Sequence, residues 1–207
     1  MTRIKCCGVT RSEDGVLAAS LGVEAVGVVF AARSPRRVSV ARAREIVGSL
    51  PPFVASVALF MDDAESLVRD VLDTVRPSLL QFHGQETDAW CAQFGHPFVK
   101  AVAMGEGVAA LARLTAYPHA AALLLDGHGR DEPGGTGRRF DWSLVPPGIA
   151  QPLILAGGLN AANVAAGIHT LHPWAVDVSS AVEQAPGIKD ADKLAAFIRA
   201  VRAADQA

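Results

Sequence analysis

The sequence predicts an α/β fold, a single-domain (β/α)8 barrel of the TIM type that spans residues 1–207. Eight short apolar segments recur along the chain, stretches with helical spacing separate them, and no linker or low-complexity segment divides the chain. The apolar segments start roughly 20 to 30 residues apart, and eight such units in 207 residues match a barrel at the short end of its size range. A doubly wound open sheet is the main competing fold, because strand–helix alternation alone does not establish closure.

The apolar segments have the nearly continuous hydrophobic character of parallel strands that are covered on both faces. We predict the eight strands at Ile4–Val9, Ala25–Phe30, Val54–Phe60, Leu79–Phe82, Phe98–Ala103, Ala121–Leu125, Leu153–Leu155 and Ala175–Val178.

Amphipathic helices are predicted between the strands, most clearly at 43–50, 68–75 and 194–201, where apolar residues follow helical spacing. Residues of the type that caps helix N-termini precede the second, third, seventh and last helices: Ser39, Asp62, Asn160 and Asp190. The sixth helix is the weakest, because Pro146-Pro147 cuts short the segment 141–144.

Composition restricts the class of partner and the compartment. The formal net charge is -2, so no basic excess exists to neutralise nucleic-acid phosphates or an acidic membrane surface. No apolar run approaches the roughly 18 residues that a membrane span needs, and the first residues lack the pattern of a secretory signal. Three cysteines, an odd number, favour a reducing setting. We therefore expect a cytoplasmic protein.

The carboxyl ends of the strands of a parallel barrel form its active site. Polar, reactive and glycine residues gather at these predicted ends and are scarce within the strands. They are Cys7, Arg36, His83, Asp126, Gly157, Gly158, Asp177, Ser179 and Ser180.

Cys7 and Asp126 are the candidates for acid–base chemistry that the strand pattern supports. Strand alternation places Cys7 on the same face as Lys5, which indicates that Cys7 points into the barrel, whereas Cys6 faces the helices. A buried free cysteine that only packs is the alternative. Asp126 directly follows an apolar strand, so we expect burial to raise its pKa and to favour proton donation. A helix cap, or pairing with a nearby arginine such as Arg130, is the alternative for Asp126.

Three small-residue segments have the composition of anion-binding loops: residues 134–137, which include Gly135, then Gly157-Gly158, and Ser179-Ser180. The last two follow the seventh and eighth strands, where barrels often bind phosphate, and they predict a phosphorylated substrate. Arg36 can hold a carboxylate through two parallel hydrogen bonds, or Arg36 and Arg37 can form a solvated surface pair. His169 and His172 have no neighbouring carboxylate or cysteine in sequence, and no nucleotide-binding motif is present. We predict neither a metal site nor a cofactor.

The strand-end motifs resemble those of the phosphoribosylanthranilate isomerases, and the resemblance covers nearly the whole chain in order. The matching segments are Lys5-Cys6-Cys7-Gly8-Val9-Thr10, Gly27-Val28-Val29-Phe30 with Ser34-Pro35-Arg36, Leu80-Gln81-Phe82-His83-Gly84, Gly134-Gly135-Thr136-Gly137 through Trp142, Leu155-Ala156-Gly157-Gly158-Leu159 with Asn163-Val164, and Val176-Asp177-Val178-Ser179-Ser180 through Lys189-Asp190. Cys6 and Phe82 depart from the aliphatic residues usual in that family.

The resemblance implies an isomerase of tryptophan biosynthesis that rearranges N-(5-phosphoribosyl)anthranilate, an aminoaldose, to the 1-deoxyribulose isomer. By the family pattern Asp126 is the general acid and Cys7 the general base, and Arg36 holds the anthranilate carboxylate. The backbone around Gly135, Gly157, Gly158, Ser179 and Ser180 holds the phosphate. Asp177 lies near the opened sugar, and His83 is a further residue close to the substrate. The substrate is then the small-molecule partner, and the protein is expected to be a monomer or a homodimer.

Other barrels that act on phosphorylated sugars are the nearest alternatives. An indole-glycerol-phosphate synthase is expected to have a longer N-terminal extension and a lysine–glutamate pair. A metal-dependent epimerase needs histidines and aspartates at several strand ends. A two-substrate isomerase that also serves histidine biosynthesis is expected to have an aspartate at position 7. A non-catalytic phosphate-binding barrel needs neither Cys7 nor Asp126.

Overall fold

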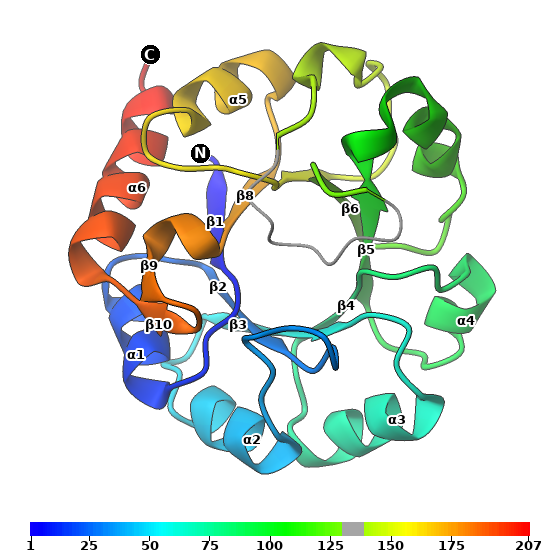
Figure 1. Cartoon of the computed structure of the whole chain (residues 1–207), viewed down its shortest axis with the longest axis vertical. Coiled ribbons are helices and arrows are strands. Elements are labelled where there is room, and N and C mark those ends of the chain that lie inside the picture. Colours follow the sequence, from blue (N-terminus) through cyan, green and yellow to red (C-terminus); the bar gives the residue numbers. More distant parts are fainter. Residues whose placement is uncertain (130–138) are drawn as a thin grey trace.

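The computed structural model describes residues 1–129 and 139–207 and confirms the closed barrel. All eight strands are parallel and pair in chain order, and the last pairs with the first, which excludes the open sheet (Figure 1). The strands are β1 (Arg3–Cys6), β2 (Ala25–Val29), β3 (Ala55–Phe60), β4 (Leu79–Phe82), β5 (Phe98–Ala103), β6 (Ala122–Asp126), β7 (Leu153–Leu155) and β8 (Ala175–Val178).

Helices surround the barrel as an outer ring (Figure 1). The α-helices are α1 (Ser12–Ser20), α2 (Val40–Gly48), α3 (Glu65–Thr74), α4 (Asp88–Ala92), α5 (Val164–Leu171) and α6 (Ala191–Ala204). Three segments are 3-10 helices: η1 (Met104–Thr115), η2 (Trp142–Leu144) and η3 (Ser180–Val182). A short antiparallel hairpin, β9 (Glu183–Ala185) and β10 (Ile188–Lys189), follows η3. Within the described ranges, no helix has the length and apolar character needed to cross a membrane.

Strand positions agree with the sequence pattern, and two strand ends differ in ways that matter for the site. β1 ends at Cys6, earlier than the predicted Val9, because the chain turns away at Gly8, whose φ is +75°. Cys7 still donates its N–H to the carbonyl of Val178 at 2.8 Å. Asp126 is the last residue of β6, and it was predicted to follow the strand.

Two of the four predicted helix caps are confirmed. The Ser39 hydroxyl accepts a hydrogen bond from the N–H of Arg42, and the Asp190 carboxylate accepts from the N–H groups of the first turn of α6. The prediction for Asp62 is wrong, since α3 begins after Ala64, and Asp62 lies in the loop before it with a φ of +55°. The prediction for Asn160 is also wrong, because α5 begins after Asn163. Asn160 instead accepts a hydrogen bond within the preceding turn.

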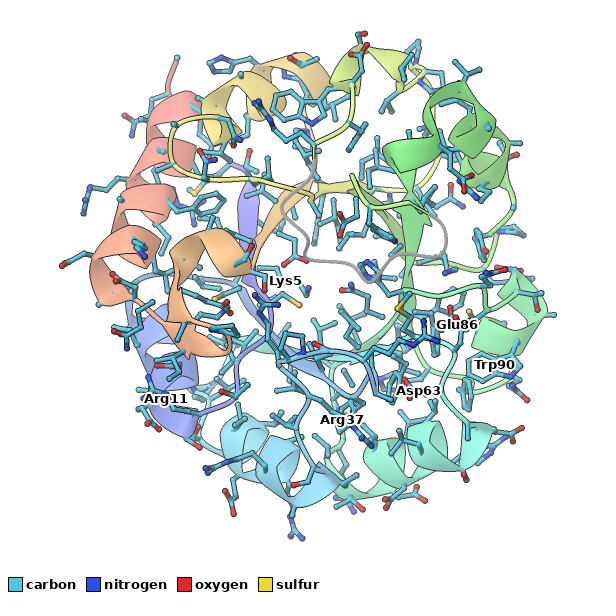
Figure 2. The ribbon with its side chains drawn as sticks, in the orientation of Figure 1. Lys5, Arg11, Arg37, Asp63, Glu86 and Trp90 are labelled. Atoms are coloured by element: carbon cyan, nitrogen blue, oxygen red, sulfur yellow. The ribbon has the colours of Figure 1, made fainter. Side chains whose placement is uncertain are left out.

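Strand alternation divides the buried residues into an outer and an inner layer. Ile4 and Cys6 of β1 belong to the large cluster that packs the strands against the helices. Lys5, between them, points into the barrel, where its label lies near the centre of the ring in Figure 2. A second, smaller cluster of aliphatic side chains fills the barrel interior beside β5 to β8. The inner layer is therefore apolar on one side and polar where β1 and β8 meet.

Phe82 is the centre of an aromatic cluster in the outer layer. Its ring is fully buried and lies 5.3–6.0 Å from the rings of four other aromatic residues: Phe60, Trp90, Phe94 and Phe98. We expect Phe82→Ala to lower the free energy of unfolding by about 3–5 kcal/mol, because it removes these contacts and leaves a cavity. Phe53→Ala is the matched control: that side chain is fully exposed, and its loss should change stability by less than about 0.5 kcal/mol. Urea unfolding followed by circular dichroism measures both, and equal losses would contradict this assignment.

Candidate active site

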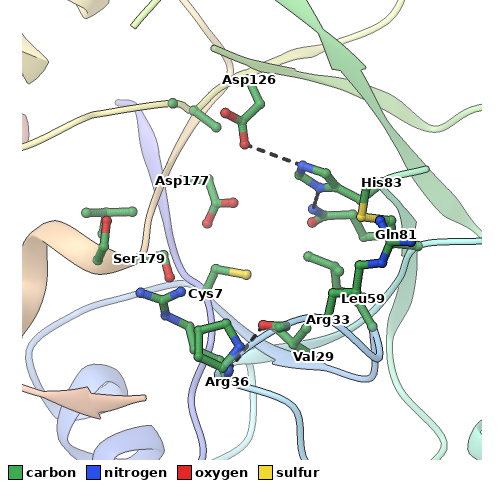
Figure 3. Close-up of a pocket in the computed structure, with 18 of the residues that line it drawn as sticks. Cys7, Val29, Arg33, Arg36, Leu59, Gln81, His83, Asp126, Asp177 and Ser179 are labelled. Carbon is green, nitrogen blue, oxygen red and sulfur yellow. Dashed lines mark hydrogen bonds and ion pairs between the residues drawn. The ribbon is translucent and has the colours of Figure 1, made fainter. Parts of the chain in front are cut away.

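A cavity of about 710 Å³ opens at the carboxyl ends of the barrel strands (Figure 3), a size typical of small-molecule sites. The structure brings to its wall every predicted site residue within the described ranges: Cys7, Arg36, His83, Asp126, Gly157, Gly158, Asp177, Ser179 and Ser180. Gly135, the remaining predicted phosphate-binding residue, lies outside the described residues. His169 and His172, for which no site was predicted, do not line this cavity, and His169 faces the carbonyl of Ala204.

Cys7 points into the cavity beside a buried ion pair. Lys5 Nζ donates to Asp177 at 2.8 Å, and both side chains are almost entirely buried. Burial lowers the pKa of Lys5, but the charges of Asp177 and Cys7 outweigh it and keep the ammonium protonated. Burial raises the pKa of the Cys7 thiol above its ordinary value, although Lys5 acts in the opposite direction. Gly27 of β2 leaves room for this thiol, since a Cβ there would lie 2.9 Å from the sulfur.

Asp126 has an environment opposite to the one that the sequence indicated. Burial does favour its neutral form, but the adjacent imidazoles of His128 and His83 outweigh burial and lower its pKa below the ordinary range. The prediction of a raised pKa is therefore wrong. Its carboxylate lies 3.4 Å from His83 Nε2 and 3.4 Å from His128 Nδ1. At neutral pH Asp126 is ionised in the free protein.

His83 directly follows β4 and lies between Gln81 and Asp126. Gln81, two residues earlier on the same face of the strand, lies 3.1 Å from His83 Nδ1. Burial lowers the pKa of His83, which favours the neutral imidazole. If the Gln81 amide donates to Nδ1, the ring carries its proton on Nε2, the atom that faces Asp126. His128 stacks on His83 with ring centroids 4.6 Å apart.

Arg36 is held at the cavity rim by Glu183. Its Nε and one terminal nitrogen donate to the two carboxylate oxygens at 2.8 and 2.7 Å. Lys189 also donates to Glu183, at 2.7 Å, and to the carbonyl oxygen of Cys7 at 2.6 Å. Burial raises the pKa of Glu183, but the hydrogen bonds from Arg36 and Lys189 outweigh it and lower that pKa. This arrangement fixes the direction of the guanidinium, whose pKa Glu183 raises.

Small residues form the wall after β7 and β8. Gly157 and Gly158 have φ values of +79° and +65°, a conformation that favours glycine and exposes the backbone of the turn. The Gly158 carbonyl accepts from the Asn163 side chain at 2.9 Å, which fixes this turn against the start of α5. Ser179 and Ser180 lie where β8 passes into η3. Both turns line the cavity, so their backbone groups can approach an anion closely.

Sequence reasoning did not select four residues that shape the site: Gln81, His128, Glu183 and Lys189. Gln81 shares the inward face of β4 with His83, so alternation provided a signal for it. Glu183 and Lys189 lay within a family motif, but their contact with Arg36 depends on closure of the barrel. His128 stands alone in a loop, and no local pattern in the sequence marks it.

Residues 4–200 match the family model described as N-(5'-phosphoribosyl)anthranilate (PRA) isomerase. The chain belongs to this family. A phosphoribosylanthranilate isomerase from Pseudomonas paraeruginosa is 52% identical over 200 residues, which are 97% of this chain and 95% of the relative. Family membership confirms the resemblance that the strand-end motifs indicated.

Solved structures of family members have the same fold. The enzyme from Thermotoga maritima has a TM-score of 0.91 at 38% identity, covering 98% of this chain and 100% of that one, and it has been described as dimeric. A family member in complex with reduced 1-(o-carboxyphenylamino)-1-deoxyribulose 5-phosphate has a TM-score of 0.83 at 35% identity, with 98% and 100% covered.

Proposed function

We propose that this protein is an N-(5'-phosphoribosyl)anthranilate isomerase of tryptophan biosynthesis. The observation that carries the proposal is the convergence of a thiol, Cys7, and a carboxylate, Asp126, on one cavity. Cys7 directly follows β1, and Asp126 ends β6. The same cavity offers a guanidinium for a carboxylate and two small-residue turns for a phosphate.

The reaction needs an acid and a base at separate atoms of the substrate. Asp126 donates a proton to the furanose ring oxygen, and the ring opens to a protonated Schiff base. Cys7 then takes the proton from C2′, and the resulting enolamine tautomerises to the ketone. Such positioned proton transfers contribute about 10²–10⁴-fold each. Arg36 binds the anthranilate carboxylate, and the backbone of Gly157, Gly158, Ser179 and Ser180, with Gly135, binds the phosphate.

Asp177 and His83 are assigned to the middle of the substrate. Asp177 is held by Lys5 at the cavity wall, where it can accept a hydrogen bond from a hydroxyl of the opened sugar. His83 contacts Asp126 and orients its carboxylate. The small phosphorylated substrate is the partner of this site. A monomeric or homodimeric state, a cytoplasmic location, the absence of nucleic-acid binding and independence of cofactors stay predictions.

Removal of the acid or the base tests the assignment. We expect Cys7→Ser and Asp126→Asn each to lower turnover by at least ~100-fold, the usual scale for lost acid–base catalysis. The substrate is made in place from anthranilate and phosphoribosyl pyrophosphate with a phosphoribosyltransferase, and the loss of its fluorescence is followed. Cys6→Ala is the matched control, because Cys6 faces the helices, and it should keep near-normal turnover. A wild-type protein that does not accelerate the loss beyond spontaneous hydrolysis overturns the function.

The pKa shifts predict an unusual pH profile. The reaction needs neutral Asp126 and ionised Cys7, yet the lowered pKa of Asp126 and the raised pKa of Cys7 favour the opposite distribution. Each distribution places one proton on the two residues together. The fraction of the protein in the reactive distribution is therefore small, and it stays constant at every pH between the two pKa values. We expect kcat/KM to be flat between about pH 7 and pH 8.5, above the second phosphate pKa of about 6. A slope of one in log kcat/KM across this range contradicts the assignment.

The two neighbouring arginines allow a paired test of carboxylate binding. Arg36 lines the cavity and is fixed by Glu183, whereas Arg37 is exposed and does not line it. We expect Arg36→Met to raise KM by at least tenfold, about 1.4 kcal/mol, with a smaller change in kcat. Arg37→Met should leave both constants within about twofold, a difference of less than ~0.5 kcal/mol. Steady-state kinetics on the two variants decide the matter, and an unchanged KM for Arg36→Met refutes this role.

A further inference from the structure

Two imidazoles and one carboxylate converge at the edge of the cavity. The atoms that can bind a metal ion are His83 Nε2, a carboxylate oxygen of Asp126 and His128 Nδ1, and all lie within 4.8 Å of one another. His83 follows β4, Asp126 ends β6, and His128 stands two residues later. All three residues are buried, and His128 is only 1% exposed. We call this set the His83–Asp126–His128 cluster. Its residues lie at the ends of β4 and β6, which β5 separates in the barrel.

The carboxylate–imidazole distances within the cluster are close to those between the ligand atoms of four-coordinate zinc. Zinc binds histidine nitrogen at about 2.0–2.1 Å and carboxylate oxygen at a similar distance. Tetrahedral angles then place neighbouring ligand atoms about 3.3 Å apart. The two carboxylate–imidazole distances in the cluster are both 3.4 Å. His83 Nε2 faces Oδ2 and His128 Nδ1 faces Oδ1, and the ligand atoms as a set lie within 4.8 Å of one another, so the side chains must move closer together to bind one ion.

Two imidazole nitrogens of the cluster lack a hydrogen-bond partner among the described residues. His83 Nε2 and His128 Nδ1 are buried and have no well-aligned hydrogen-bond partner among the described residues, although both face Asp126. Buried polar atoms are nearly always satisfied, so two such nitrogens that face one carboxylate favour a site that can bind a cation. The rings stack with an interplanar angle of 28°, and each nitrogen faces one of the two carboxylate oxygens of Asp126.

Gln81 can adapt to a metal bound at His83. A histidine that binds a metal through Nε2 carries its proton on Nδ1 and donates it to a neighbouring acceptor. The Gln81 side chain lies 3.1 Å from Nδ1, and its Oε1 has no partner within the described part of the chain. Oxygen and nitrogen of an amide exchange places by a simple rotation. After that rotation Gln81 accepts the Nδ1 proton and leaves the Nε2 lone pair for the ion.

The local charge is compatible with a cation. Asp126 supplies a negative charge, and Asp177 lies close enough for the two carboxylates to influence each other. Three cations among the described residues of this region are each paired with a carboxylate: Lys100 with Glu86 at 3.2 Å, Arg113 with Glu106 at 2.8 Å and Lys5 with Asp177 at 2.8 Å. His83 and Asp126 line the large cavity, which gives an ion a route to the cluster and allows a water to complete its coordination.

We propose that His83, Asp126 and His128 bind one divalent transition-metal ion of zinc-like chemistry, and that the bound ion inhibits the protein. Inhibition follows because the ion occupies the carboxylate that must donate a proton. The proposed inhibition rests on the proposed function, whereas the proposed metal binding does not.

Cobalt is the probe for the site, because four-coordinate Co²⁺ absorbs visible light where Zn²⁺ does not. The full-length protein is stripped of metal and titrated with Co²⁺. We expect saturation at one ion per chain, with the absorption lost when Zn²⁺ is added. His128→Gln should weaken the Co²⁺ Kd by at least ~100-fold, and Gln81→Leu by about tenfold, as found for metal ligands and the residues that orient them.

A matched histidine variant separates this cluster from general surface binding. His119 pairs with Asp88 at the protein surface, so His119→Gln removes an exposed histidine–carboxylate pair and should leave the Kd unchanged. Because His128→Gln could perturb folding, its circular dichroism and thermal midpoint are compared with wild type. His83→Gln provides a second variant with the same expected loss of Co²⁺ binding.

Several outcomes overturn the proposal. One is the absence of saturable binding, and another is full binding by folded His128→Gln. A third is a thiolate-to-cobalt band that disappears in Cys7→Ser, which assigns the ion to the thiol.

The proposed inhibition has its own test. Zn²⁺ at saturation should abolish wild-type isomerase activity and spare the activity of His128→Gln, each relative to the same variant without metal. Unchanged wild-type activity at saturation overturns the proposed inhibition. A protein without isomerase activity still gives the Co²⁺ result, so the two failures are distinguishable.

Discussion

The buried ion pair between Lys5 and Asp177 is the constraint on which the rest of the site depends. It joins β1 to β8, the two strands whose pairing closes the barrel, and its members are register partners. An isolated buried charge costs several kcal/mol, and only a well-placed partner offsets that penalty. A shift of register by one residue turns the side chains of a strand to the opposite face. The pair is therefore satisfied in the closed barrel and in one register.

Closure in this register places the residues that follow the two strands side by side. Cys7 follows Lys5 on the same face of β1, and Ser179 follows Asp177 on β8. Lys189 of the β9–β10 hairpin reaches both, through the carbonyl oxygens of Cys7 and Ser179 at 2.6 and 3.3 Å. Glu183, in the same hairpin, fixes Arg36 from the other side. The pairing of β1 with β8, together with the β9–β10 hairpin, thus positions the Cys7 thiol, the Ser179 turn and the Arg36 guanidinium.

The sequence predicted what depends on local pattern and missed what depends on closure. Alternation along β1 correctly directed Cys7 inward, because the strand period is two whatever the partner strand is. The hydrogen bonds between Arg36 and Glu183 join residues 147 positions apart, and no local pattern encodes such a contact. The pKa of Asp126 was predicted in the wrong direction for the same reason. Burial could be inferred from the apolar run before it, but the presence of His83 and His128 could not.

The environment of Asp126 bears on its proposed role as general acid, because the residue is ionised in the free protein. His83 and His128 stabilise its charge, and the cavity beside it is open to water in the free protein. A bound substrate displaces that water, and loss of solvation favours the neutral form of a carboxyl group. The phosphate and the anthranilate carboxylate of the substrate add negative charge, which acts in the same direction. Substrate binding therefore raises the pKa of Asp126 from its low value. In the proposed mechanism Asp126 can then take up a proton, in exchange for the one that the Cys7 thiol releases, and pass it to the ring oxygen.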